Sequence, residues 1–180
     1  MVNRVFTKAQ MTKRVSRFKD AQWNPRAFID TVLPQFEREL FGIIGTGAKE
    51  DQSIPPRIKE TDGYGMSFIK CAPQKGTGLH DHTTSEVFMV LTGQWSVHWG
   101  DEGENELILD PLDAISVPAG VMRGFRNVSD ETAMLLAIVS GNKPDRIIWS
   151  SQVMDAVRAK GFEFDGSGNI AEISKSEVGA

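Results

Sequence analysis

The sequence predicts a single-domain, all-β protein, a barrel of short strands with a few short flanking helices. Its 180 residues suit one domain with a sizeable core, and its 40% hydrophobic and 24% charged residues are typical of a compact globular chain. Between Tyr64 and Val139, short apolar runs alternate with turn residues. Short strands spaced so closely are typical of a sandwich or a barrel.

Six strands are expected in this middle part of the chain. They cover residues 66–71, 87–91, 95–99, 106–109, 114–117 and 133–139. The segments between them are rich in glycine, proline and acidic residues, which supply the backbone angles and the side-chain hydrogen bonds of tight turns. The alternation of strands and turns therefore predicts a sandwich or a barrel.

The chain is expected to divide into three parts. Residues 1–58 form an extension with a basic tail, a short helix near residues 35–40 and a loop; residues 59–145 form the barrel. Residues 146–180 form a helix and a hairpin that pack on the barrel. The tail carries six basic residues before the first acid, Asp20, and lacks the apolar region of a secretory signal. We expect it to be a solvated segment.

The carboxy-terminal part contains a capped helix. Ser150 or Ser151 can cap it, and its apolar positions have helical spacing up to Lys160. Residues 162–164 and 170–173 are expected to form a closing hairpin. The turn that begins at Asp165 superficially resembles a calcium loop, but its glycine and distal glutamate are misplaced, so a plain turn is expected.

Charge and cysteine content limit the partners. The 20 basic and 24 acidic residues give a formal net charge of -4, which does not favour nucleic acid. No apolar stretch approaches the roughly 18 residues of a membrane span, so no membrane partner is expected. The single cysteine, Cys71, excludes an internal disulfide and suits a reducing compartment. A cytoplasmic location is expected.

The chemistry is predicted from a histidine cluster. All three histidines, His80, His82 and His98, lie within nineteen residues. Residues two apart on a strand project from the same face, and Glu86 lies at even separation from His80 and His82. Two imidazoles and one carboxylate suit iron(II), and they also accept manganese, nickel or zinc. The alternative is two surface histidines in a loop.

Two motifs resemble those of the cupin superfamily. The first motif is matched in the family's spacing by His80, His82, Glu86 and Gly93. The second is matched by Asp113, Pro118, Gly120 and Asn127, although Leu112 stands where glycine is common. The resemblance implies a jelly-roll β-barrel with the two histidines and Glu86 as metal ligands inside it, and with tight turns at Gly93 and Gly120.

The second motif departs from the family at Arg123, where a fourth ligand, a histidine, is usual. Arginine stays protonated and offers no lone pair to a metal. At ~5 Å from a divalent ion, with an effective dielectric constant near 20, the repulsion would be about 6 to 7 kcal/mol. An anion lies between them, the side chain turns away, or the metal is absent. We expect Arg123 to point into the barrel mouth and bind a substrate carboxylate or Glu86, whereas Arg126 is expected at the surface.

The remaining histidine is expected outside the barrel. His98 alternates with two tryptophans, so it lies outside if these fill the interior; a ligand role is the alternative. The expected cavity wall consists of Phe88, Val90, Trp95, Val97 and Trp99. Such a wall suits an apolar or aromatic substrate.

These features predict a metal-dependent, dioxygenase-like oxidoreductase that acts on a small anionic or phenolic compound. Glu86 and Arg123 are the expected catalytic residues, and one divalent metal, with iron(II) favoured, is the expected cofactor. The alternatives are a non-catalytic small-molecule-binding barrel, in which Arg123 pairs with Glu86, and a sugar-type isomerase or epimerase. A homodimer is expected, with its contact supplied by an open sheet edge and by Phe36, Leu40 and Phe41.

Overall fold

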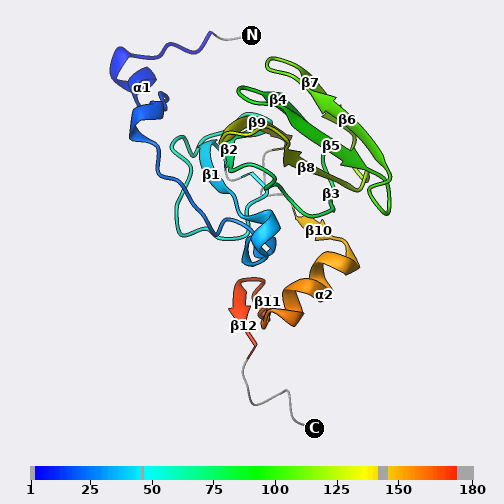
Figure 1. Cartoon of the computed structure of the whole chain (residues 1–180). Coiled ribbons are helices and arrows are strands. Elements are labelled where there is room, and N and C mark those ends of the chain that lie inside the picture. Colours follow the sequence, from blue (N-terminus) through cyan, green and yellow to red (C-terminus); the bar gives the residue numbers. More distant parts are fainter. Residues whose placement is uncertain (1–2, 46, 142–145, 174–180) are drawn as a thin grey trace.

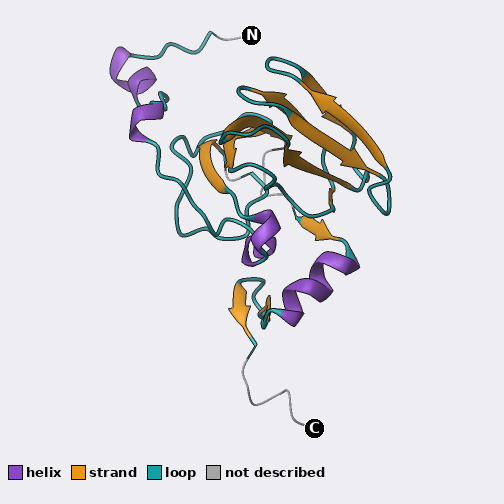
Figure 2. Ribbon diagram, in the orientation of Figure 1, coloured by secondary structure: helices purple, strands orange, loops and turns teal. Residues whose placement is uncertain are grey.

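Two five-stranded antiparallel sheets form the body of the protein (Figure 1; Figure 2). The computed structural model describes residues 3–45, 47–141 and 146–173. The first sheet contains, in spatial order, β1 (Glu39–Ile44), β2 (Tyr64–Cys71), β9 (Ala133–Ser140), β4 (Glu86–Val90) and β7 (Ala114–Val117). The second contains β10 (Ile147–Trp149), β3 (His80–His82), β8 (Arg123–Asn127), β5 (Trp95–Trp99) and β6 (Asn105–Leu109). The predicted all-β fold with few short helices is confirmed.

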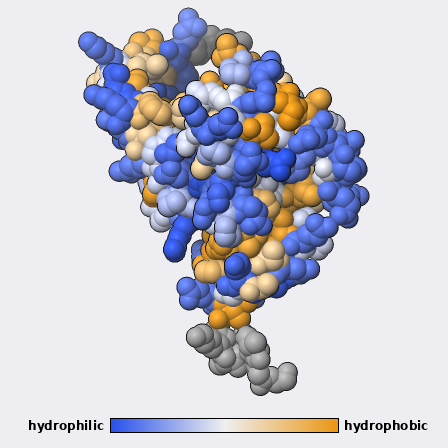
Figure 3. Space-filling model, viewed as in Figure 1, coloured by the Kyte–Doolittle hydropathy of each residue, from blue (hydrophilic) through white to orange (hydrophobic). Residues whose placement is uncertain are grey.

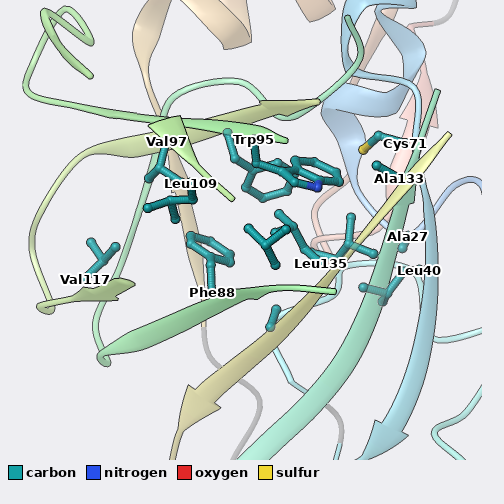
Figure 4. Close-up of a cluster of buried hydrophobic side chains, with 14 residues drawn as sticks. Ala27, Leu40, Cys71, Phe88, Trp95, Val97, Leu109, Val117, Ala133 and Leu135 are labelled. Atoms are coloured by element: carbon teal, nitrogen blue, oxygen red, sulfur yellow. The ribbon is translucent and has the colours of Figure 1, made fainter. Parts of the chain in front are cut away.

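Alternating apolar side chains from both sheets form the core (Figure 4). Phe88 and Val90 of β4, Trp95 and Val97 of β5 and Leu135 of β9 are all 0% exposed. Burying a side chain of this size stabilises the folded state by about 1.5 to 3 kcal/mol. The alternation seen in the sequence therefore fixes which face of each strand points inward.

The expected short helix over residues 35–40 is wrong. Pro34–Phe36 forms a single turn of 3-10 helix, and the chain then enters β1. In β1, Phe41 pairs with Phe68 of β2, and Glu39 forms an ion pair of 2.6 Å with Lys70. These cross-strand contacts outweigh the weak local helical preference of so short a segment.

Two of the residues expected at a dimer contact lie in β1 and are buried within the single chain. Leu40 and Phe41 are 5% and 4% exposed within the single chain, so they are core residues and are not available as a contact surface. The strand lies in the segment that the sequence assigned to the extension, yet it extends the first sheet. The three-part division of the chain and the dimer stay predictions.

The carboxy-terminal part contains the expected helix and hairpin. The Ser150 side chain accepts a hydrogen bond from the Val153 amide and caps α2 (Ser151–Ala159). β11 (Phe162–Phe164) and β12 (Ile170–Glu172) then pair. Asp165 accepts hydrogen bonds from the Ser167 and Asn169 amides, so the segment between these two strands is a turn.

The basic segment extends away from the sheets (Figure 1). It contains α1 (Lys8–Thr12) and a 3-10 turn at Phe18–Asp20, and most of its residues are exposed. Phe18 anchors it through edge contacts with Trp23 and Phe68.

Hydrophilic residues cover much of the face in Figure 3. Within the described residues, no helix has the length and apolar character needed to span a bilayer.

Glu50, in the loop after β1, forms hydrogen bonds with two segments that are distant in sequence. Its carboxylate accepts hydrogen bonds from the Ile29 amide at 2.6 Å and from Nε1 of Trp149 at 2.7 Å. Ile29 and Trp149 belong to a second apolar cluster, which also contains Val153 and Val157 of α2. Burial raises the pKa of Glu50 to about 7.

The tight turns carry residues with positive φ. Gly93 and Gly120 have φ of 71° and 77°, so both turns expected from the motif resemblance are present. Leu112 has φ 76° and is 72% exposed, so a branched side chain occupies a left-handed position. This conformation is costly for residues other than glycine, because Cβ approaches the following carbonyl oxygen.

We expect Leu112→Gly to stabilise the protein by about 0.5 to 1 kcal/mol, because relief of the left-handed strain exceeds the added chain entropy of glycine. Chemical denaturation measures the change. Leu107→Gly is the matched control, since Leu107 is an exposed leucine in strand β6 and should lose stability. Equal destabilisation by both changes would contradict the prediction.

The raised pKa of Glu50 predicts a pH-dependent stability. The unfolded carboxyl group titrates near 4.5 and the folded one at about 7, so folding favours the protonated form. This contribution is complete below pH about 4.5 and is lost as the pH rises through 7, amounting to about 3 kcal/mol. Thermal unfolding from pH 5 to 8 should show a smaller decline for Glu50→Gln than for the wild type. Glu60→Gln, at an exposed position, should keep the wild-type decline.

Candidate functional site

Three buried side chains converge at one point between the sheets. β3 places His80 and His82 on its inward face, and Glu86 begins β4, so a short turn brings the carboxylate back to the histidines. Their exposed fractions are 4%, 2% and 5%. One ligand atom from each lies within 4.8 Å of the others. The structure therefore brings together the three residues that the spacing selected.

His80 is held in a defined orientation. Its Nδ1 lies 2.9 Å from the Gly78 carbonyl oxygen, which can only accept, so Nδ1 carries the proton and Nε2 the lone pair. Its ring packs against Trp149, with 5.2 Å between ring centroids. Burial lowers the pKa of His80 well below its usual value, and the Arg123 guanidinium acts in the same direction. The imidazole is thus neutral, the form that binds a metal.

Arg123 points into the barrel and bonds to Glu86. It begins β8 opposite His80 and is 0% exposed. Its Nη2 and Nε donate to the same oxygen of Glu86, Oε2, at 2.8 Å and 3.2 Å. Asp81 adds a longer contact, 3.7 Å from Nη1. The anion that Arg123 binds within the barrel is thus the carboxylate of Glu86, one of the two partners expected for it.

The same oxygen also faces His82. Nε2 of His82 lies 3.5 Å from Oε2 of Glu86, so Glu86 lies between an imidazole and a guanidinium. A carboxylate so placed can bind a cation through its lone pairs while remaining hydrogen-bonded to Arg123. Glu86 can therefore help to bind a divalent ion, or it can remain paired with Arg123 alone.

A small cavity of about 40 Å³ adjoins the cluster. His80, His82 and Glu86 line it together with two cationic residues, Arg38 and Lys49. Its apolar wall is built by Phe28, Leu40, Ala48, Ile69, Phe125, Ala137, Val139, Ile147 and Trp149. Arg123 does not line this cavity, because it lies behind Glu86.

The expected cavity wall is wrong. Phe88, Val90, Trp95 and Val97 are fully buried in the core, and Trp99 is only partly buried; none of them lines the cavity. Phe88, Val90, Trp95 and Val97 belong instead to the buried apolar core, part of which is drawn in Figure 4. The sequence correctly marked these residues as inward-facing, but it could not tell which inward positions stay beside the open space.

His98 lies outside the barrel, as expected from its alternation with the tryptophans. It lines a separate outer groove together with Glu106 and Arg126, which form a surface ion pair of 3.7 Å. Burial lowers its pKa, and Arg126 acts in the same direction. His98 is not part of the three-residue cluster, so its alternative role as a ligand is wrong.

Sequence analysis missed Trp149, Glu50 and Lys49. Trp149 lies in β10, a strand of three residues, and it packs on His80 while donating to Glu50. Lys49 lies in the loop after β1 and reaches the cavity. A short alternating run, Ile147 to Trp149, was the one available signal for Trp149, and no local signal marked Lys49.

Comparison with known proteins agrees with this architecture. Residues 67–139 match the family model for the cupin domain, Cupin_2. No curated protein sequence shows significant similarity to the chain. The family match begins within β2, ends one residue before the end of β9 and includes His80, His82, Glu86 and Arg123.

Solved structures share the fold at low sequence identity. The polyketide cyclase RemF from Streptomyces resistomycificus has a TM-score of 0.51 and 17% identity, covering 84% of this chain and 89% of that one. A cupin 2 domain-containing protein from Halorhodospira halophila has a TM-score of 0.52 and 19% identity, covering 68% and 77%. An oxalate oxidase has a TM-score of 0.52 and 20% identity, covering 75% of this chain but 62% of its own length, less than two thirds. The sheet order, the two motifs and the family match together identify residues 67–139 as a cupin domain.

Proposed function

We propose that the protein is a metal-dependent, dioxygenase-like oxidoreductase that acts on a small anionic or phenolic compound. The observation that carries the proposal is the buried convergence of His80, His82 and Glu86 within 4.8 Å. Two imidazoles and one carboxylate this close together can offer three ligand atoms to a single ion. A divalent ion satisfies all three groups at once.

The donor set fits such an ion. The Gly78 carbonyl leaves the lone pair of His80 on Nε2, and the low pKa of His80 keeps that lone pair available. Two nitrogens and one carboxylate oxygen suit iron(II), with manganese, nickel and zinc as further candidates. When bound, the metal would supply Lewis-acid and redox chemistry. His80, His82 and Glu86 would hold it.

The chain's own residues set the environment of this centre. Arg123 acts through Glu86: two of its N–H groups donate to Oε2 and orient the carboxylate. This makes Arg123 a positioning residue, while Glu86 stays the candidate proton acceptor. The apolar wall excludes water and suits the carbon skeleton of a small substrate. The cytoplasmic location also stays a prediction.

A second candidate function has a specific observation in its favour. The Arg123–Glu86 ion pair balances the charge of Glu86 without any metal. In a binding module, the pair would complete the cavity and the barrel would hold a small anion without turnover. The comparisons name enzymes among the similar structures, but those activities belong to those proteins.

Metal content separates the two functions. After reconstitution with iron(II) and gel filtration, we expect about one transition-metal ion per chain, measured by elemental analysis. His80→Ala removes a ligand and should lower the retained metal at least about tenfold. His98→Ala is the matched control, because His98 lies outside the barrel, and it should retain wild-type metal. A metal-free wild type would favour the binding module.

Arg123→His tests the departure from the family motif. It removes a fixed positive charge and offers a further imidazole, so metal affinity should rise. Without metal the variant should be less stable by about 3 to 5 kcal/mol, because Glu86 loses its buried partner. The readout is the melting temperature with and without added metal, for which the variant should show the larger rise.

Arg126→His is the control for that experiment, since Arg126 is exposed and pairs with Glu106 at the surface. It should respond to metal as the wild type does. An equal metal-dependent shift in Arg123→His and the wild type would show that the Arg123 position lies outside the reach of the metal.

A further inference from the structure

Among the residues that the structure describes, three cations are buried, and two of them have carboxylate partners. Arg38 lies 2.8 Å from both oxygens of Asp30, and it also donates to the Phe36 and Gly76 carbonyls. Arg123 pairs with Glu86. A buried charge is tolerated when it is paired and hydrogen-bonded, so these two guanidinium groups are accounted for.

Lys49 is the third buried cation, and neither its charge nor all of its N–H groups have a partner at close range in the described part of the chain. It is 6% exposed, and its ammonium group donates to the Ile54 carbonyl oxygen. Among the residues that the structure describes, no carboxylate oxygen lies within 4.0 Å of Nζ. A neutral carbonyl satisfies one of the three N–H groups and none of the charge. Burial lowers the pKa of Lys49, and Asp51 opposes that shift.

Lys49 lines the cavity that contains the His80, His82 and Glu86 cluster. The charge of the other lining cation, Arg38, is balanced by Asp30, although its buried Nε has no hydrogen-bond partner among the described residues. Arg123 is paired with Glu86 and is not among the residues that line the cavity. Lys49 is therefore the cation among the described lining residues whose charge has no carboxylate partner within 4.0 Å. The wall around it is mainly apolar, which strengthens an ion pair formed there.

We propose that Lys49 binds the anionic group of the ligand and that the ligand is a small monocarboxylate with a short apolar body. The cavity is small, about 40 Å³, so a compact ligand fits and a long-chain acid does not. The inference deepens the proposed function, on which its link to a substrate rests. It moves the anion-binding role from Arg123 to Lys49.

Acetate and its neutral isostere acetamide test this assignment on the full-length chain. Thermal unfolding is measured in increasing acetate or acetamide, with ionic strength held constant by sodium chloride. Acetate should raise the melting temperature of the wild type, and acetamide should not. Lys49→Met removes the charge at similar length and should weaken the apparent affinity for acetate at least about tenfold. Lys49→Arg keeps the charge and should keep the preference for acetate over acetamide.

Lys75→Met is the matched control. Lys75 also donates to a backbone carbonyl, that of Pro34, but it lies outside the cavity, so its acetate response should equal that of the wild type. Equal acetate responses in Lys49→Met and the wild type would overturn the assignment. Equal effects of acetate and acetamide on the wild type would overturn it as well.

Metal measured in the same samples separates the two proposals. Acetate that bound only through a metal would stabilise Lys49→Met as much as the wild type, which counts against Lys49. A metal-free wild type with a Lys49-dependent acetate response would remove the proposed oxidoreductase and leave Lys49 as the anion site.

Discussion

The buried ion pair between Arg123 and Glu86 governs the arrangement of the barrel interior. Each charge loses several kcal/mol of hydration on burial, and removing either partner would leave the other uncompensated. The pair therefore fixes the Glu86 carboxylate where β4 begins and the guanidinium where β8 begins. Oε2 of Glu86 is held between Arg123 and His82, and any ion that enters must share this carboxylate.

The rest of the site follows from that constraint. Arg123 is occupied by Glu86 and lies outside the cavity wall, so it cannot be the first group that a ligand's anion meets. Arg38 is engaged by Asp30 in the same way. The positive charge that remains beside the open space belongs to Lys49. One side of the cavity thus offers lone pairs for a cation, and another offers an ammonium group for an anion.

Support for the cluster comes from residues distant in sequence. Glu50 bonds to Trp149, and Trp149 packs on His80, so a loop after β1 and the strand β10 both help to orient the histidine. Side chains that orient a ligand contribute to metal affinity although they do not touch the metal. The cavity depends on the extension and on the carboxy-terminal part as much as on the barrel strands.

Much of the fold could be predicted, because strand alternation and turn chemistry are local. Residues 95–99 and 114–117 are strands with the expected bounds, and Ser150 caps α2. The helix expected over residues 35–40 does not form, because contacts with a distant segment decide the structure there. β1 exists because Phe41 and Glu39 find partners on β2, and no local pattern encodes those partners.

The sequence by itself determined the alternation that builds the two sheets, the spacing that places His80, His82 and Glu86 on a shared face, and the few ways in which Arg123 could be tolerated. These are short-range consequences of strand period and residue chemistry. Only the tertiary structure decided that Glu86 is the partner of Arg123, that Trp149 rather than Trp95 walls the cavity, and that Lys49 reaches it. Such choices depend on which distant segments pack together, because the cost of a buried charge is set by the groups that surround it in space.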